Sequence, residues 1–400
     1  MDTLSIAPLS LPSDHLGLYV HIPFCRSKCC YCDFASQPLS LAPSLPEHYL
    51  DALVREATLR RAEIDRPLHS IFIGGGTPTM LSGAQLLRLW TEVIEPFPRL
   101  PGAEITIEAN PGTLNDDVLA ALSQLPLTRI SLGVQSIHDD ELLMLGRIHV
   151  QQDTIDAVMA LRSINIPQIN LDLMYALPRQ SSARWIESLH QSLELKPDHL
   201  SLYALILEQG TPLAAQVLAG TLPEPSEDEE EIMLSDTVRL LSQAGFTRYE
   251  VSNAARPGAV CRHNLGYWLG RDYLGLGASA VSTVHGLRWR NMHDTAEYVQ
   301  RLKEVRGAIE YAERLSARAR LLERVMLGLR LYNGFNLAEA EAEYGCRLCD
   351  VAPVALAAAQ RTGLLCYDGQ HICLTHTGYP MANTVVSRLM NEEQQVQGVL

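Results

Sequence analysis

The chain of 400 residues is poor in basic side chains and has no long apolar run. Lys and Arg total 32 against 46 Asp and Glu, so the formal net charge is −14 at pH 7. Proteins that bind nucleic acid present a basic surface to the phosphates, so we expect no nucleic-acid partner. No apolar stretch approaches the roughly 18–20 residues that cross a bilayer, which predicts no membrane-spanning helix.

The N-terminal segment also lacks basic charge. The first twenty residues contain two aspartates and no lysine or arginine. Signal and transit peptides carry basic residues, so the sequence predicts no targeting segment. Nine cysteines in a chain without such a signal are expected to be reduced thiols, which predicts a cytoplasmic location.

Short β-like runs alternate with helical stretches between residues 18 and 244. The expected strands are 18–22, 70–76, 104–111, 129–136, 169–178 and 199–208. The expected helices are 47–63, 83–95, 115–124, 152–163, 182–194 and 228–244. This alternation indicates parallel βα units. Six units predict an α/β fold with a partial (β/α)6 TIM-like barrel, in which chemistry lies at the C-terminal ends of the strands.

A different pattern begins near Ser316. This serine can cap a helix that stops at Asn333-Gly334, a second short helix follows, and a third spans 351–361. A hairpin then turns at Asp368-Gly369. Three helices and a hairpin predict a small winged-helix-like α+β domain. The predicted divisions are an N-terminal extension at 1–16, a barrel with its extension at 17–310, and the winged-helix-like domain at 311–400.

Three cysteines, Cys25, Cys29 and Cys32, stand close together in HIPFCRSKCCYCDF. The spacing C-x3-C-x2-C lets one short loop present three thiolates to an iron–sulfur cluster, with one iron left open for a small molecule. Half of a zinc site and three ordinary buried thiols are the alternatives, although zinc normally takes a fourth protein ligand. Cys30 lies inside the motif and is interpreted as a packing residue, because adjacent cysteines cannot easily both face one cluster.

Polar or glycine-rich motifs close several of the expected strands. Gly74-Gly75-Gly76-Thr77-Pro78 ends the second strand, where glycines let the backbone approach a ligand and offer it their amides. Glu108 closes the third strand and suits a ligand's amino or hydroxyl groups, and Asp172 on the fifth suits ribose hydroxyls. Gln135 and Arg147 follow the fourth strand. Each alone is equally suited to a structural hydrogen bond, but their common location favours a ligand site.

These motifs resemble those of a known family. The segment from Tyr19 through HIPFCRSKCCYCDF resembles the radical S-adenosylmethionine (SAM) superfamily. Together with GGGTP, the elements EANPGT, GVQS, LGRIH and LDLMYALP are similar to the oxygen-independent coproporphyrinogen III oxidase group over nearly the whole chain. The resemblance implies a [4Fe–4S] cluster on Cys25, Cys29 and Cys32, whose open iron binds SAM. It also implies reductive cleavage of SAM to a 5′-deoxyadenosyl radical, with an electron donor such as flavodoxin or ferredoxin.

The same resemblance implies which residues surround SAM. Contacts with cluster-bound SAM fall on Tyr19, Gly75, Glu108 and the GGGTP loop. The positions that line the neighbouring SAM or substrate pocket are Tyr31, Gly76, Thr77, Gln135, Arg147 and Asp172.

A second motif, His263-Asn264-Leu265-Gly266-Tyr267-Trp268, resembles the HNxxYW signature of the heme chaperone subgroup HemW. An imidazole is a good axial ligand for heme iron, and Tyr267 and Trp268 offer apolar stacking surface. His263 is therefore the predicted heme ligand. The oxidases of the group carry a further cysteine after the cluster motif, where this chain has Phe34, and a longer segment before Tyr19.

We therefore expect a protein that binds heme and transfers it to acceptor proteins, respiratory ones above all. The alternative is an oxygen-independent coproporphyrinogen III oxidase, which decarboxylates two propionates to vinyl groups. The expected partners are heme and its acceptors, with membrane contact only through those acceptors. The cluster can also support a homodimer. Whether the protein is an enzyme, and whether it cleaves SAM, is left open.

Overall fold

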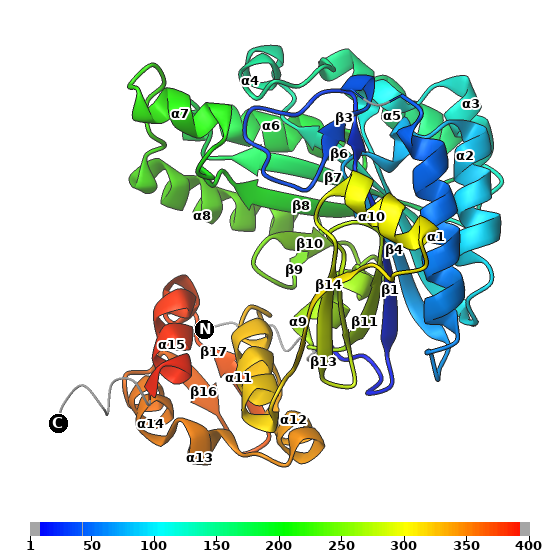
Figure 1. The fold of residues 1–400 in the computed structure, drawn as a ribbon. Coiled ribbons are helices and arrows are strands. Elements are labelled where there is room, and N and C mark those ends of the chain that lie inside the picture. Colours follow the sequence, from blue (N-terminus) through cyan, green and yellow to red (C-terminus); the bar gives the residue numbers. More distant parts are fainter. Residues whose placement is uncertain (1–8, 42, 393–400) are drawn as a thin grey trace.

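The computed structural model describes residues 9–41 and 43–392. A 12-stranded sheet forms the main body, and a smaller C-terminal unit packs against one end of it (Figure 1). The strand order is β14-β13-β12-β11-β1-β4-β5-β6-β7-β8-β10-β9. In the ranges described, no helix is both long and apolar enough to cross a membrane.

The centre of the sheet consists of the six parallel strands that the sequence predicts. They are β1 (Leu16–Ile22), β4 (Leu68–Gly75), β5 (Arg99–Ala109), β6 (Arg129–Gln135), β7 (Gln168–Tyr175) and β8 (His199–Ala204). Each pairs in parallel with the next. Most side chains on both faces of β1 and β6 are buried, as is typical of a parallel sheet covered by helices. Because the sheet stays open between β14 and β9, the predicted partial (β/α)6 barrel is confirmed.

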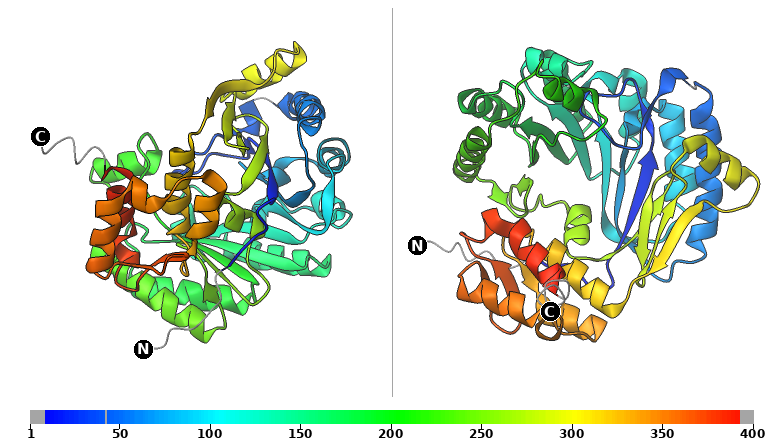
Figure 2. Two further views of the ribbon diagram at one scale, coloured as in Figure 1. Left: turned by 90° about the horizontal axis from the view of Figure 1, so that it is seen from below. Right: turned by 60° about the vertical axis from the view of Figure 1, so that its left-hand side comes forward.

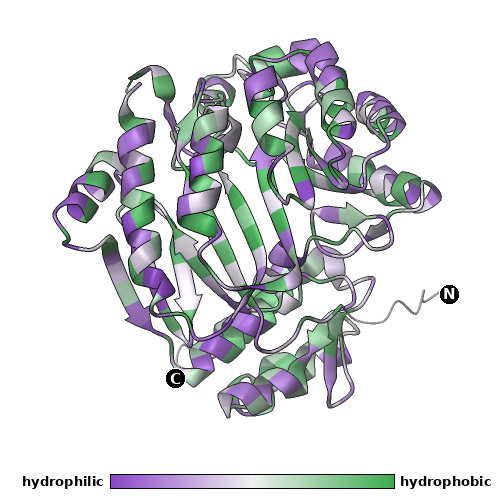
Figure 3. Cartoon of the chain, turned by 90° about the vertical axis from the view of Figure 1, so that its right-hand side faces the viewer, coloured by the Kyte–Doolittle hydropathy of each residue, from purple (hydrophilic) through white to green (hydrophobic). Residues whose placement is uncertain are grey.

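A helix follows each of these strands along the chain. The helices are α1 (Leu45–Arg61), α2 (Gly83–Arg88) with its continuation η3 (Leu89–Ile94), α3 (Asp116–Leu122), α5 (Gln151–Ser163), α6 (Ser182–Glu194) and α8 (Glu227–Gln243). The hydroxyls of Ser82, Ser181 and Ser226 accept backbone N–H bonds and fix where three of them begin. The helices lie along the outer face of the sheet, whose strands are mainly hydrophobic (Figure 3).

The sheet extends beyond the predicted strands on both sides. β11 (Asp272–Leu276) runs parallel to β1, and β12 (Val281–Val284), β13 (Leu287–Asn291) and β14 (Ile309–Arg314) follow in antiparallel order. On the other side lie β10 (Asn253–Ala255) and β9 (Thr247–Arg248). The sequence predicts a strand and a turn in 246–258, the segment that contains β9 and β10. It did not lead to an assignment of β11, β12, β13 or β14, because glycine and charged residues interrupt the apolar pattern there.

Four further helices of the main body were also not predicted. They are α4 (Asp139–Met144), α7 (Pro212–Leu218), α9 (Arg262–Trp268) and α10 (Thr295–Lys303). Of these, α9 matters most for function, because it carries the HNxxYW motif. It lies against β1 and β4, and its Leu265 and Leu269 belong to the hydrophobic core of the C-terminal unit.

The C-terminal unit has the predicted helices and hairpin. Its elements are α11 (Ala317–Gly328), β15 (Phe335–Asn336), α12 (Leu337–Tyr344), α13 (Leu348–Val351), α14 (Pro353–Arg361), β16 (Leu365–Tyr367), β17 (His371–Leu374), η5 (Tyr379–Met381) and α15 (Ala382–Met390). Ser316 caps α11 through Ala319 N, and the Asp368 carboxylate closes the hairpin turn. The predicted division between 310 and 311 falls inside β14. This unit and the cysteine loop lie at opposite ends of the barrel (Figures 1 and 2).

Candidate functional site

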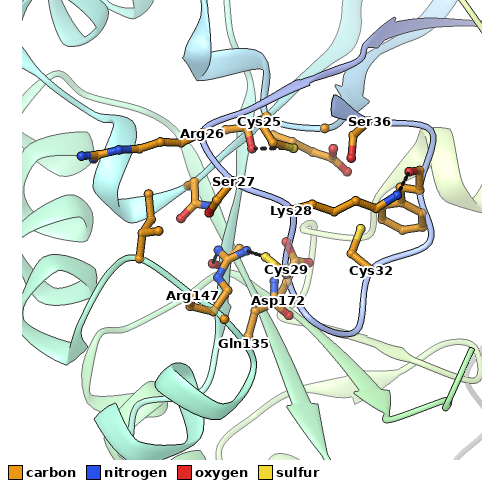
Figure 4. Close-up of a pocket in the computed structure, with 18 of the residues that line it drawn as sticks. Cys25, Arg26, Ser27, Lys28, Cys29, Cys32, Ser36, Gln135, Arg147 and Asp172 are labelled. Carbon is orange, nitrogen blue, oxygen red and sulfur yellow. Dashed lines mark hydrogen bonds between the residues drawn. The ribbon is translucent and has the colours of Figure 1, made fainter. Parts of the chain in front are cut away.

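The loop between β2 (Phe24–Cys25) and β3 (Gln37–Pro38) presents the three predicted cluster cysteines. It follows β1 directly, and parallel pairing of β2 with β3 brings its two ends together. Cys25, Cys29 and Cys32 line a cavity of about 300 Å3 at the C-terminal ends of the barrel strands (Figure 4). Cys30 packs instead with a small hydrophobic cluster, close to Gly146. This contact agrees with its interpretation as a packing residue.

Most of the predicted ligand residues reach the same cavity. Those that line it with the cysteines are Tyr31, Gly75, Gly76, Thr77, Glu108, Gln135, Arg147 and Asp172. They meet because parallel strands present their C-terminal ends on one side of a barrel. Gln135 has a φ of +65°, a sparsely populated conformation of the kind that clusters at functional sites. Tyr19 and His263 line a second cavity in the barrel interior instead.

The glycine turn after β4 holds the cysteine loop in place. Gly76 N donates to Ile22 O and Thr77 N donates to Phe24 O, both at 2.8 Å. A Cβ at Gly76 would lie 2.7 Å from Phe24 O and 3.0 Å from Cys25 Sγ, so only glycine allows this approach. Gly75 N donates to Glu108 Oε2 at 2.9 Å. These amides therefore bind protein atoms, whereas the sequence analysis expected them to bind the ligand.

Two carboxyl groups face the cavity. Burial, and then the charge of Asp172, raise the pKa of Glu108 to about 8. Asp172 accepts from Ser131 Oγ at 3.0 Å and from Asn170 Nδ2 at 2.8 Å, and burial raises its pKa. A ligand ammonium group beside Glu108 would favour the ionised carboxylate and lower this pKa. The pair therefore suits a ligand that carries an amino group.

Arg147 lies against the cysteine loop from the barrel side. Its Nη2 donates to Gly133 O at 2.6 Å and its Nη1 to Cys29 Sγ at 3.5 Å. The guanidinium of Arg147 therefore lies beside one of the candidate cluster ligands. Burial raises the pKa of the Cys25 and Cys32 thiols, so their deprotonation is coupled to metal binding.

The HNxxYW histidine lies in the barrel interior, in a cavity of about 200 Å3. Its ring nitrogens Nδ1 and Nε2 lie 3.0 Å from Ser70 Oγ and from Tyr267 Oη respectively. His263 is 3 % exposed, and burial lowers its pKa to about 3, so the imidazole is neutral at pH 7. The structure therefore places His263 apart from the cysteines, with both nitrogens engaged.

Glu104 fixes the start of α9 and was missed by the sequence analysis. Its Oε1 accepts from His263 N and its Oε2 from Arg262 N, both at 2.9 Å. A carboxylate suits this place, because the first N–H groups of a helix lack partners within the helix. The alternating pattern of EITIE puts Glu104 on the same face of β5 as Glu108, and this periodicity was the available signal.

Aromatic rings connect the HNxxYW motif to the cysteine loop. Phe72 stacks on His263 with ring centroids 5.3 Å apart, and Tyr19 stacks on Phe72 at 6.4 Å. The Tyr19 hydroxyl lies 2.9 Å from His21 Nδ1, and His21 Nε2 lies 2.8 Å from Ala35 O in the loop. Tyr19 therefore acts on the loop through His21.

The three thiols fit a cubane cluster better than a single ion. Among the described residues, no three His, Cys, Asp or Glu side chains converge on one metal position. In a cubane each cysteine binds a different iron, so the thiolates surround a volume and do not meet at a point. Cys25, Cys29 and Cys32 all line one cavity, as three ligands of such a cluster would.

Comparison with known proteins supports this reading. Family models match residues 19–191, described as the radical SAM superfamily, and residues 315–381, described as the HemN C-terminal domain. Heme chaperone HemW of Mycobacterium tuberculosis is 36% identical over 387 residues, which are 96% of this chain and 97% of the relative. Heme chaperone HemW of Lactococcus lactis is 34% identical, over 94% of this chain and 97% of the relative.

A solved structure shares the fold over almost its whole length. Coproporphyrinogen III oxidase (HemN) from Escherichia coli has a TM-score of 0.81 at 26% identity, covering 95% of this chain and 91% of that one. The resemblance and the fold class predicted from the motifs are thereby confirmed. The radical SAM match also implies a [4Fe–4S] cluster and SAM.

The first prediction concerns the cysteine assignment. Cys29→Ala should abolish the broad iron–sulfur absorption near ~400 nm after anaerobic reconstitution, because three thiolates are needed to hold the cluster. The matched control is Cys30→Ala, which removes the neighbouring thiol and should keep iron and sulfide at the wild-type level. An unchanged iron and sulfide content in Cys29→Ala would show that this loop does not hold the cluster.

The second prediction concerns pH. The pKa of Glu108 is raised from 4.5 to about 8 in the folded chain, so the folded state holds one more proton than the unfolded state between these values. Without ligands, wild type should lose about 1.4 kcal/mol of unfolding free energy per pH unit relative to Glu108→Gln as pH rises from 5 to 8. Urea unfolding at several pH values measures this difference.

An exposed position on α8 provides the control for that experiment. Glu231→Gln removes the same charge and should follow the wild-type pH dependence. Parallel curves for wild type and Glu108→Gln would show that Glu108 ionises normally in the folded chain.

Proposed function

Because this chain belongs to the HemW family of radical SAM proteins, we propose that it is a heme chaperone, which binds heme and delivers it to acceptor proteins. The observation that carries the proposal is the extent of the match, which includes the barrel, α9 and the C-terminal unit. The HNxxYW motif and Phe34 at the mouth of the cysteine cavity support the same subgroup.

We assign the cofactor residues on the geometry of the cysteine cavity. Cys25, Cys29 and Cys32 would hold the [4Fe–4S] cluster, which when bound offers one iron to SAM. Glu108 is placed to pair with the ammonium group of SAM, and Asp172 to accept from ribose hydroxyls. The other residues that would line the SAM site are Tyr31, Gly75, Gly76, Thr77, Gln135 and Arg147.

We keep His263 as the proposed heme ligand, with a condition that the structure imposes. Its Nε2 is engaged by the Tyr267 hydroxyl, so iron can reach it only after that hydrogen bond opens. The cavity around His263, about 200 Å3, also borders Tyr267. Movement of this one tyrosine would therefore free the nitrogen and widen the space beside it.

The partners follow from this function. They are heme, its acceptor proteins, respiratory ones above all, and an electron donor of the flavodoxin or ferredoxin class. We place the chaperone in the cytoplasm, in contact with membranes only through its acceptors, and the cluster supports a homodimer.

A second candidate function is coproporphyrinogen III oxidation. The fold shared with HemN favours it, and the cavity between Glu108 and Asp172 can hold a ligand beside the cluster loop. Phe34 counts against it, because it stands where the oxidases of this group carry a further cysteine. Its side chain is 64 % exposed at the edge of the cavity.

The test is a heme titration of the anaerobically reconstituted protein, followed at the Soret band. Wild type should bind heme saturably, and His263→Ala should bind about tenfold or more weakly, because it loses an iron ligand. Tyr267→Phe should bind at least as tightly as wild type, because it frees Nε2 and keeps the ring.

Two other outcomes are informative. If heme binds saturably and His263→Ala binds it as tightly as wild type, the protein is a chaperone whose heme ligand is another residue. If the protein binds no heme saturably and converts coproporphyrinogen III, its function is that of the oxidase and the chaperone proposal is wrong.

A further inference from the structure

A cavity of about 310 Å3 lies where α9 and β11 meet the C-terminal unit. It is distinct from the cysteine cavity and shares no lining residue with it. Four arginines line it: Arg271, Arg288, Arg320 and Arg324. Two acidic residues, Asp272 and Glu323, also reach it. The charge of the lining is therefore positive.

Three of the four guanidinium groups are paired. Arg288 donates twice to Glu323, at 2.8 and 2.6 Å. Arg271 donates to Glu339 at 2.7 Å, and Arg320 donates to Glu343 at 3.1 Å. Asp272 is engaged by Arg66, outside the cavity. The acidic groups near the cavity are thus already matched to other cations.

Arg324 has no such partner in the part of the chain that is described. It is 4 % exposed on α11, and its Nη1 makes no hydrogen bond with any described residue. Its guanidinium lies over the Phe335 ring at 5.0 Å, an apolar neighbour. Burial, and then the charge of Arg271, lower its pKa to about 10. The carboxylates of Glu339 and Glu343 act on Arg324 in the opposite sense, but they pair with Arg271 and Arg320, and neither forms an ion pair with Arg324. A buried cation that lacks a directly paired anion is unfavourable, so the site is suited to an anionic ligand.

The rest of the lining indicates which anion. Leu315, Met326 and Leu327 give the cavity an apolar side, and Tyr267 and Tyr273 border it. A guanidinium fork matches a carboxylate, and apolar walls suit an apolar body attached to it. The structure therefore favours a carboxylate on a hydrophobic molecule over a free inorganic anion.

We propose that Arg324 binds a propionate carboxylate of heme, so that the propionate edge of the macrocycle lies in this cavity; this inference rests on the proposed heme-carrying function. Tyr267 borders both this cavity and the one that contains His263. A heme held at Arg324 would therefore be separated from the His263 imidazole by one movable side chain. The two observations place heme at the base of the barrel, away from the cluster.

The experiment compares heme with heme dimethyl ester, whose propionates carry no charge. Arg324→Met should weaken heme binding at least about tenfold, because a charge-assisted hydrogen bond is lost. The ester should bind wild type and Arg324→Met equally. The matched control, Arg361→Met, removes an exposed arginine from α14 of the same unit and should bind heme like wild type.

A second readout separates this role from a structural one. Arg324→Met should melt at the same temperature as wild type or higher, because an unpaired buried cation is replaced by an apolar group. Glutarate should raise the melting temperature of wild type saturably, beyond sodium chloride at equal ionic strength, and should not do so for Arg324→Met. Arg324→Lys, which keeps the charge without the fork, should fall between the two.

The heme, ester and glutarate results together separate the Arg324 proposal from the proposed function. Equal heme affinity in wild type and Arg324→Met would overturn the proposal. So would a loss of ester affinity in Arg324→Met that is as large as its loss of heme affinity. If wild type binds no heme but glutarate stabilises it through Arg324, the chaperone function falls and a carboxylate site remains. If neither heme nor glutarate binds wild type, both proposals fall.

Discussion

The site depends on the attachment of the cysteine loop to the glycine turn after β4. Two backbone hydrogen bonds, from Gly76 to Ile22 and from Thr77 to Phe24, fix the loop to the end of the neighbouring strand. They can form only because Gly76 has no Cβ between its backbone and Cys25. The turn therefore has a mechanical role: it sets where three thiols stand relative to the barrel. The ligand is then recognised by side chains of other strands.

The two ends of the barrel have different chemistry. The cysteine end holds ionisable ligands around a cavity that suits a cluster and an amino-acid-like molecule. The opposite end is closed by α9, which Glu104 anchors through the first N–H groups of the helix. The stack of His263, Phe72 and Tyr19 joins the ends through packed rings. If heme binds at the α9 end, a shift of the ring stack can reach the cluster loop through the Tyr19–His21 contact.

Much of the barrel could be predicted from the sequence, because parallel strands and their crossover helices have strong apolar patterns. The cluster cysteines and the strand-end carboxylates followed from spacing and position, since parallel strands end on one side. The hydrogen bond between Tyr267 and His263 was missed because no helix was assigned to residues 262–268, although in a helix the i,i+4 spacing brings these two side chains together. The sequence could not find Arg324 among many arginines, since lack of a partner is a property of the folded neighbourhood.

In the proposed function, heme and the cluster occupy opposite ends of one barrel. Hydrogen–deuterium exchange of the reconstituted protein, with and without heme, tests it most directly. We expect heme to slow exchange in α9 and α11, with little change in the loop from Cys25 to Ser36 beyond what the ring stack transmits. Protection confined to that loop, with α9 and α11 unchanged, would contradict this expectation and place heme beside the cluster.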